Sequence, residues 1–356
     1  MLIRDIISVI ERFAPLSLQE EWDNSGLQCG DASAECTGVM LCLDVTPDVI
    51  EEASARGCNL VVSHHPMIFR GIKRLTGATV AERCIVAAIS HNMAVYSSHT
   101  ALDSADGGVS HALAALLGAR VRRVLHPIDT ELLRLTVYAP REKADDVQTA
   151  LADSLSPGAI IASDSQSLRQ DMKEEADSVP VMNLIHRPLT SFSLTVSALQ
   201  RHDAETALIG FGDDVTYSFE RLADRDLRYG LGVVAELPEA ISVEHFIKRA
   251  KDALGASVLR CSRTVPGSMV RRIAFCGGAG GEFIPDAVRA GADAYVTADI
   301  RYHDFGEWGS SILLVDAGHF ETETCTKMIL MQLIKEKFAN FAVYIAASEH
   351  NPITYL

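Results

Sequence analysis

Closely spaced pairs of cysteines are absent from this chain of 356 residues. It has eight cysteines, and no two of them are spaced as C-x-x-C. This absence excludes a zinc–thiolate knuckle and a thioredoxin-like redox motif. Several cysteines lie in apolar runs, such as Cys42 in "VMLCLDV" and Cys276 in "IAFCGG". We interpret them as small buried hydrophobic residues in a reducing compartment.

Long apolar runs and an excess of positive charge are also lacking. The formal net charge is −15, which gives no electrostatic support for binding nucleic acid or an anionic membrane. No apolar run approaches the length that spans a bilayer. The first residues, "MLIRDIISVIERF", have the isoleucine spacing of an amphipathic helix, and their charges interrupt any signal-peptide core. We expect a soluble, cytoplasmic protein with no membrane or nucleic-acid partner.

The order of expected elements predicts an α/β fold with an insertion. A chain of this length exceeds what one compact core usually serves, and 48% hydrophobic residues suffice for a globular interior. Strand and helix patterns alternate over residues 1–126 and again over 229–356, which is typical of a layered α/β domain. Residues 127–228 contain alternating strands and a long polar stretch. We predict one domain of two related α/β halves and, between them in sequence, a small α+β module.

Imidazole and carboxylate groups follow three expected strands. His64 and His65 end the run "NLVVSHH", Asp103 follows "MAVYSSH", and His319 and Glu323 follow "SILLVDAG". Ligands of open α/β sheets collect at the carboxyl ends of strands, so we expect these five side chains to meet in one site. Core packing does not require charged and titratable groups at three strand ends. A single histidine at a strand end, by contrast, is more often structural.

The five groups favour a transition-metal site. Their imidazole and carboxylate donors suit Zn, Mn, Fe, Co or Ni better than Ca. His319 and Glu323 are four residues apart at a helix start and therefore share a face. His64 and His65 serve one cleft only if the strand has ended, and Pro66 supports that. One ion would be crowded by all five residues, whereas two ions would leave positions for water, with Glu323 or Asp103 as a bridge.

Four further features have weaker signals. His99 lies four residues before Asp103 in what we expect to be a loop, where it could orient a ligand or transfer protons. His303 also follows a strand and could line the cleft. The glycine-rich segment 275–288 could receive an anion or simply make a tight turn near the sheet. The polar segment 20–30 around Trp22 could be a lid or a packed loop.

Five blocks in this order resemble the Nif-three-like family, whose members are called GTP cyclohydrolase 1 type 2 homologs. The blocks are "EEWDNSGLQCG", "VVSHHPMIF", "YSSHTALDSADGG", "GGAGGEFIPDAVRAGADAYVTADIRYHD" and "DAGHFETE". The resemblance implies a two-half α/β domain, a di-metal centre and toroidal hexamers whose metals face the inner cavity. It places the metal ligands on His64, His65, Asp103, His319 and Glu323. Longer members resemble this chain in carrying an inserted PII-like or CutA-like module.

Two functions of different classes fit these residues. The first is a hydrolase that uses two divalent ions, with Glu323 bridging the ions and His99 moving protons. The family label suggests a small-molecule substrate, a purine nucleotide such as GTP, whose ring is opened by water. The second is a metal-handling or regulatory binding protein without turnover. A structural scaffold with a vestigial site ranks last.

Overall fold

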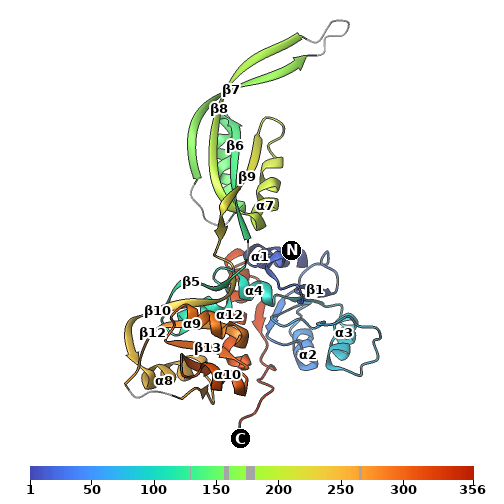
Figure 1. Cartoon of the computed structure of the whole chain (residues 1–356). Helices are drawn as coiled ribbons and strands as arrows, with labels where there is room; N and C mark the ends of the chain where they lie inside the picture. The colour runs from blue at the N-terminus through green and yellow to red at the C-terminus, as the bar shows by residue number, and fades with distance from the viewer. Residues whose placement is uncertain (129, 156–159, 174–180, 264–266) are drawn as a thin grey trace. The chain divides into compact units, whose positions relative to one another are not determined.

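The chain divides into two units. The computed structural model describes residues 1–128, 130–155, 160–173, 181–263 and 267–356. The larger unit comprises residues 1–128 and 227–356, and the smaller unit comprises residues 129–226. Figure 1 shows helices and strands mixed throughout the larger unit, which confirms the expected α/β class.

The first sheet of the larger unit has five strands. Their order across the sheet is β1 (Gly26–Cys29), β4 (Ala94–Ser97), β3 (Leu60–Ser63), β2 (Val39–Cys42) and β15 (Val343–Ile345). The last four are parallel, and β1 is antiparallel to β4. The associated helices are α1 (Ile3–Phe13), α2 (Pro47–Ala55), α3 (Val80–Ser90) and α12 (Thr326–Lys337). Strands β2, β3 and β4 are buried along their whole length, as in sheets covered on both faces.

The second sheet has six strands. Their order is β11 (Arg260–Cys261), β14 (Leu313–Asp316), β13 (Ala294–Ala298), β12 (Met269–Ala279), β10 (Gly230–Ser242) and β5 (Arg120–Pro127). Strands β12, β13 and β14 are parallel to one another. The helices of this half are α5 (Val109–Leu116), α8 (Val243–Leu254), α9 (Ile284–Arg289) and α10 (Tyr302–Trp308), and α4 (Thr100–Ser104) and α11 (His319–Glu323) lie next to the site described below.

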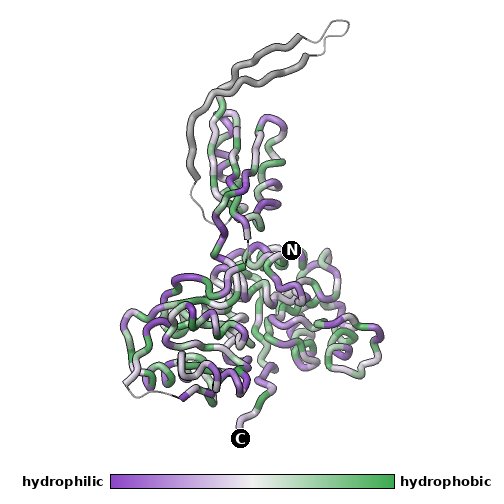
Figure 2. Tube along the Cα trace, viewed as in Figure 1, coloured by the Kyte–Doolittle hydropathy of each residue, from purple (hydrophilic) through white to green (hydrophobic). Residues whose placement is uncertain are grey.

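Each sheet takes a strand from the other end of the chain. Strand β15, near the carboxyl terminus, completes the first sheet, and β5, from the first half of the sequence, completes the second. The two halves are therefore joined in one unit rather than merely linked. Figure 2 shows hydrophobic and hydrophilic residues interspersed along the traced chain, as expected where amphipathic helices cover buried sheets.

Local sequence accounts for the helix boundaries. The isoleucines of α1 at positions 3, 6, 7 and 10 are all buried, which confirms the amphipathic pattern. The Thr46 hydroxyl accepts from the Val49 amide and caps α2, whose first residue is Pro47. The helical run over 319–337 is divided into two helices, α11 and α12. The Thr322 hydroxyl donates to the Gly318 carbonyl oxygen at 2.9 Å, and such back-bonding tends to bend helices.

The smaller unit is an α+β module. Its elements are β6 (Thr130–Pro140), α6 (Ala144–Ser154), β7 (Ile160–Lys173), β8 (Val181–Ser197), α7 (Arg201–Ile209) and β9 (Thr216–Asp226). The sheet order is β7-β8-β6-β9, with every pair antiparallel. The polar stretch 153–183, which lacks a clear pattern in sequence, contains the end of α6, strand β7 and the start of β8. Residues 156–159 and 174–180 of that stretch lie outside the described residues. The expected likeness to PII proteins stays a prediction.

Two expectations about the whole chain can be compared with the structure. Among the described residues, none of the helices combines the length and the apolar character that crossing a bilayer requires. All eight cysteines are free thiols, and five of them, at positions 36, 42, 58, 84 and 276, are buried. Their role as small hydrophobic residues is confirmed for those five.

Candidate metal centre

The paired histidines extend the ladder beyond β3. The His64 amide donates to the Cys42 carbonyl oxygen at 3.1 Å, and the His65 amide donates to that of Leu43 at 2.9 Å. The His64 side chain is fully buried, and the two imidazole centroids are 5.1 Å apart. Both rings reach the same centre because the regular strand has ended at Ser63, as the sequence indicated.

The five side chains expected to meet do lie together. The Nε2 atom of His64 is 3.6 Å from the Oδ1 atom of Asp103 and 3.6 Å from the Oε1 atom of Glu323. The other oxygen of Glu323, Oε2, is 2.9 Å from the Nε2 atom of His65 and 3.1 Å from that of His319. These residues come from the ends of β3, β4 and β14, and thus from both sheets. Glu323, with 4% of its side chain exposed, is at the middle of the group.

Outer partners fix the orientation of each imidazole. The Nδ1 atom of His64 faces the Ser98 carbonyl oxygen at 3.1 Å, and that of His65 faces the Asp44 carboxylate at 2.9 Å. The Nδ1 atom of His319 is 2.6 Å from the Asp299 carboxylate. A hydrogen bond at one ring nitrogen sets the tautomer and leaves the other nitrogen free to bind an ion. All three Nε2 atoms point to the centre, where they could bind a metal ion once deprotonated.

Asp44 and Asp299 are functional candidates that the sequence analysis missed. Asp44 follows β2 and Asp299 follows β13, so both satisfy the same strand-end rule that pointed to the five predicted residues. Their signal was present in "VMLCLD" and "AYVTAD". Asp299 also has a positive φ of 54°, an uncommon conformation for a residue other than glycine. That backbone turn directs its carboxylate to His319.

His99 lies closer to the centre than the sequence indicated. Its ring centroid is 5.4 Å from that of His64 and 5.4 Å from that of His65. The expectation that His99 and Asp103 share a loop is wrong, because His99 is the N-cap of the short helix α4. One helical turn, soon followed by Gly107 and Gly108, is too short to give a periodic pattern in sequence.

Asp23 holds His99 in place. Its Oδ1 atom is 2.7 Å from the Nδ1 atom of His99, and its Oδ2 atom accepts hydrogen bonds from the Thr100 amide and the Ser25 hydroxyl. The carboxylate is inaccessible to solvent. Burial alone would raise the pKa of Asp23, but the hydrogen bonds from His99 and Thr100 outweigh it and lower the pKa well below its usual value. Within the segment 20–30, Asp23 is therefore packed against the site and supports His99.

The donor set fits a bound cation. Among the residues that the structure describes, two groups of three side chains have ligand atoms within 4.8 Å of one another: His64, His65 and His99, and His65, His319 and Glu323. The Nε2 atom of His64 and the Oδ1 atom of Asp103 are buried without a hydrogen-bond partner. Unpaired buried polar atoms are costly, and a cation between them would satisfy both. Imidazole and carboxylate donors in this arrangement suit a divalent transition metal.

The fold and this site can be compared with known proteins. A family model described as Duf34/NIF3 (NGG1p interacting factor 3) matches residues 1–352. The chain belongs to the Duf34/NIF3 family. A curated relative from Bacillus subtilis (strain 168), named GTP cyclohydrolase 1 type 2 homolog, is 30% identical over 99% of this chain and 98% of its own length. A relative of the same name from Staphylococcus aureus (strain COL) is 27% identical over the full length of both.

Solved structures of Duf34/NIF3 relatives have the same fold. A Bacillus cereus protein related to NIF3 aligns with a TM-score of 0.84 and 26% identity, over 100% of this chain and 99% of its own. A Staphylococcus aureus protein aligns with a TM-score of 0.72 and 26% identity over the same shares. The resemblance seen in the sequence is thereby confirmed at the level of family and fold.

The electrostatics of this Duf34/NIF3 site favour protonated His65 and His319 and an ionised Glu323. Burial would lower the pKa of His65, but the carboxylates of Asp44 and Glu323 outweigh it and raise the pKa to about 10. Burial would also lower the pKa of His319, but the contact with Glu323 outweighs it and raises the pKa to about 9. Burial would raise the pKa of Glu323, yet the charge on His64 and the other imidazoles hold it well below its usual value. The centre therefore attracts positive charge.

Asp103 behaves differently from Glu323. Burial raises the pKa of Asp103 to about 7, and the nearby His64 only partly opposes this rise. A carboxyl group that is half neutral near pH 7 gains from a second positive charge beside it. An ion placed between Asp103 and His64 would supply that charge.

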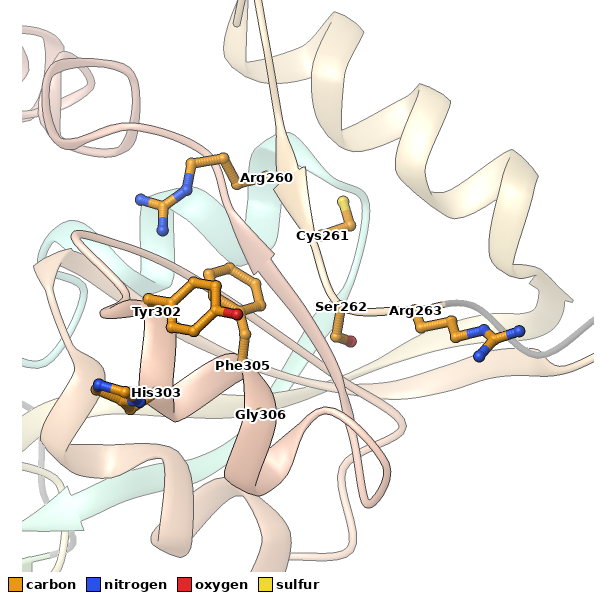
Figure 3. A pocket seen from close by; sticks show the side chains of 8 residues that line it. All are labelled: Arg260, Cys261, Ser262, Arg263, Tyr302, His303, Phe305 and Gly306. Atoms are coloured by element: carbon orange, nitrogen blue, oxygen red, sulfur yellow. The ribbon is translucent and has the colours of Figure 1, made fainter.

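His303 does not join the centre. It lines an open pocket of about 710 Å³ together with Arg260, Cys261, Ser262, Arg263, Tyr302, Phe305 and Gly306 (Figure 3). Figure 3 shows His303 and Tyr302 on α10, across the pocket from β11. The Arg260 guanidinium donates to the Asp316 carboxylate at 2.9 Å and lies over the Phe305 ring. None of the five predicted ligands lines this pocket. The expectation that His303 lines the metal cleft therefore has no support in its position.

The glycine-rich segment packs against the site. The Gly278 amide donates to the Thr322 hydroxyl at 3.1 Å, and the Gly278 carbonyl oxygen accepts from the Thr297 hydroxyl at 3.0 Å. Its backbone polar groups are thus used within the fold, and the following helix α9 has only six residues. Of the two readings of this segment, the close turn beside the sheet is the one that the geometry favours.

Proposed function

We propose that this Duf34/NIF3 protein is a divalent-metal-dependent hydrolase with a dinuclear centre, and that it acts on a purine nucleotide such as GTP. The observation that carries the proposal is the placement of Glu323 between one imidazole on one side and two on the other. One oxygen faces His64 and the other faces His65 and His319. A carboxylate with a different set of donors at each oxygen is suited to bridge two ions.

The residues on either side of Glu323 define two half-sites. His64 and Asp103 belong to the half at Oε1, and His65 and His319 belong to the half at Oε2. When bound, two divalent ions supply Lewis acidity and make a water molecule nucleophilic near neutral pH. The outer hydrogen bonds of the imidazoles keep the ligand nitrogens aimed inward, so the protein need not reorganise during the reaction.

His99 is the candidate for proton transfer. Because Asp23 bonds to its Nδ1 atom, the Nε2 atom is left for substrate or solvent. For opening of a purine imidazole ring, water adds to a ring carbon and the bond from that carbon to a ring nitrogen breaks. His99 would accept the proton that water loses and return it to the departing nitrogen, so no other reactant is needed. Hydrolysis of the resulting formamide would release formate.

Support for the nucleotide comes from the names of relatives. Several curated relatives of this chain are named GTP cyclohydrolase 1 type 2 homolog, and they match it over essentially their full lengths. The purine ring has an imidazole carbon that a strong nucleophile can attack. GTP is therefore the first substrate to test, ahead of pterins, phosphoesters and peptides.

The test is formate release from GTP by protein reconstituted with Zn, Mn, Fe, Co or Ni. The proposal predicts metal-dependent release that His99→Ala lowers at least about a hundredfold, in line with the usual contribution of a general acid–base group. His303→Ala, which changes an exposed histidine of the other pocket, is the matched control and should retain full activity. Fast, reversible metal loading without turnover of any nucleotide would instead identify a metal-handling protein.

Assembly and location are further predictions. The family resemblance predicts a hexamer whose metal centres face an inner cavity, and light scattering on the purified full chain measures that mass. A monomer or dimer at micromolar concentration would contradict it. The cytoplasmic location predicted from the sequence stays a prediction, which fractionation of cells would test.

A further inference from the structure

A row of aromatic rings leads from the candidate metal centre to the surface. The Trp22 ring centroid is 5.9 Å from that of His99 and 5.9 Å from that of Phe69, and Phe69 is 6.4 Å from His99. His99 in turn is 5.4 Å from the rings of His64 and His65. Trp22 is 58% exposed and Phe69 is 48% exposed. Two large apolar rings thus face solvent directly beside the site.

Hydrogen bonds hold this pair of rings in position. The Asn24 side-chain amide donates to the Ile68 carbonyl oxygen at 2.6 Å, and the Gln28 side-chain oxygen accepts from the Ile68 amide at 3.1 Å. The Gln28 side-chain nitrogen also donates to the Asn24 carbonyl oxygen at 2.6 Å. These contacts join the segment that contains Trp22 to the segment that contains Phe69. The rings are therefore set in place before any ligand arrives, which reduces the entropy lost on binding.

Three cationic side chains follow Phe69. Phe69 lines an open pocket of about 650 Å³ whose other walls include Arg70, Lys73 and Arg74. These three cations occur within five residues of a chain whose net charge is −15. All three are exposed, and within the described parts of the chain none of them has a hydrogen bond or an ion pair. The volume is in the range of small-molecule sites.

The one carboxylate in the lining of this pocket is already engaged. The Oε2 atom of Glu82 accepts hydrogen bonds from the Thr76 hydroxyl at 2.7 Å and from the Thr76 amide at 2.8 Å. It also accepts from the Ala78 amide at 3.2 Å. Glu82 thus folds the loop that carries the cations and forms no ion pair with them. The positive charge of the pocket stays available for an anionic ligand.

We propose that this surface binds a planar aromatic ring that carries a phosphate chain. Trp22 and Phe69 would stack on the ring, because every heteroaromatic base offers a flat π face. Arg70, Lys73 and Arg74 would bind the phosphates through charge-assisted hydrogen bonds. The inference rests on the proposed function, since it names the groups that select a nucleotide at the same centre. It assigns substrate recognition to residues outside the metal ligands.

Binding can be measured without turnover. The chain has two tryptophans, and Trp308 is partly buried against the hydrophobic core of the second sheet. In a Trp308→Phe variant of the full chain, fluorescence therefore reports on Trp22 alone. Rapid mixing with GTP, guanosine or inorganic triphosphate records the initial change before any hydrolysis. We expect saturable quenching by GTP, weaker quenching by guanosine, and weaker GTP binding at higher salt.

The decisive variant removes the three cations. Replacing Arg70, Lys73 and Arg74 together by alanine should weaken GTP binding at least about tenfold, the loss expected for even one strong charge-assisted contact. Guanosine binding should be unchanged, because the stacking rings remain. Phe69→Ala should weaken the binding of both ligands. If the Trp308→Phe chain fails to fold, the same variants are made in the chain that keeps Trp308, and calorimetric titration with each ligand measures their affinities.

A control variant removes the same charge elsewhere. Lys248, Lys251 and Arg263 are exposed and outside this pocket, so replacing all three by alanine should leave GTP affinity unchanged. Equal GTP affinity in the two triple variants, or no GTP binding by either method at millimolar ligand, overturns the inference. Binding without formate release refutes only the proposed hydrolase. Formate release with an unchanged affinity in the Arg70, Lys73 and Arg74 variant refutes only the inference.

Discussion

Gly278 lies directly against Glu323, the residue at the middle of the candidate metal centre. A β-carbon at Gly278 would be 2.1 Å from the Oε1 atom of Glu323 and 3.3 Å from the Cε1 atom of His319. The backbone of Gly278 also has a φ of +60°, which is unfavourable for a residue with a side chain. The glycine-rich segment is therefore part of the construction of the site.

Gly278→Ala should displace Glu323 and lower metal binding. The new methyl group would overlap the present position of the Glu323 oxygen, so the carboxylate must move. We expect metal affinity to fall by at least about tenfold, as for other disturbed ligand geometries. Gly281→Ala is the matched control in the same segment, because its β-carbon meets only an ordinary contact of 3.6 Å. Equal metal affinity in the two variants would contradict this account.

Removing an outer carboxylate should weaken metal binding without removing a ligand. Asp44→Ala frees the Nδ1 atom of His65, and Asp299→Ala frees that of His319. Each change should lower metal affinity about 10- to 100-fold, the usual effect of losing such a partner. Competition with a chelator of known affinity measures it. Asp48→Ala, an exposed position at the start of α2, should have no effect, and an equal loss there would argue against a specific role.

The site was predictable from sequence because of its position at strand ends. His64, His65, Asp103, His319 and Glu323 were found by one rule, and the same rule reaches Asp44 and Asp299, which carry no motif of their own. The rule predicts the edge of a sheet at which a site lies. It does not predict which other sheet contributes residues to that site. That β14 belongs to a second sheet depends on its pairing with β13, which follows from the fold of the whole chain. No local pattern contains that information.

One prediction was wrong, and one strand gave no signal in the sequence, both for local reasons. Helix α4 was missed because its five residues offer no periodicity, so the relation of His99 to Asp103 was misjudged. The segment over 160–173 forms strand β7 although its residues do not alternate in polarity. Its pairing with β8 supplies backbone hydrogen bonds that the side-chain pattern does not indicate.

The ionised form of Asp23 should stabilise the fold in a defined pH window. Its pKa is lowered in the folded state, so the stabilisation is present above the unfolded value of about 4 and is lost as pH falls below it. The difference in the free energy of unfolding between wild type and Asp23→Asn should therefore decrease as the pH is lowered from about 5 to about 3. Urea unfolding across this range measures the difference. Glu21→Gln, an exposed neighbour, should show no such difference, and a difference that grows on acidification would contradict the assignment.

The carboxyl-terminal segment is held by a buried ion pair. The Lys327 ammonium contacts the Glu349 carboxylate, with 10% and 3% of the two side chains exposed, and Glu349 also accepts from the Asp44 amide at 2.9 Å. Lys327→Met leaves a buried charge unpaired and should lower the free energy of unfolding by about 3–5 kcal/mol. Denaturant unfolding measures the loss.

Two further variants separate charge from packing. Adding Glu349→Gln to Lys327→Met removes the unpaired charge while keeping an acceptor for the Asp44 amide, so part of the stability should return. Lys335→Met, at an exposed position of the same helix, should change stability by less than about 0.5 kcal/mol. A Lys327→Met chain as stable as the Lys335→Met chain would show that the pair contributes little.

The metal content of the purified chain tests the central claim most directly. Elemental analysis of wild-type protein from metal-replete cells should find about two transition-metal ions per chain, one for each side of Glu323. The His64→Ala, Glu323→Ala double variant should lose most of that metal, whereas His303→Ala should keep it. Folded wild-type protein without metal, or a double variant with the wild-type metal content, would contradict the account.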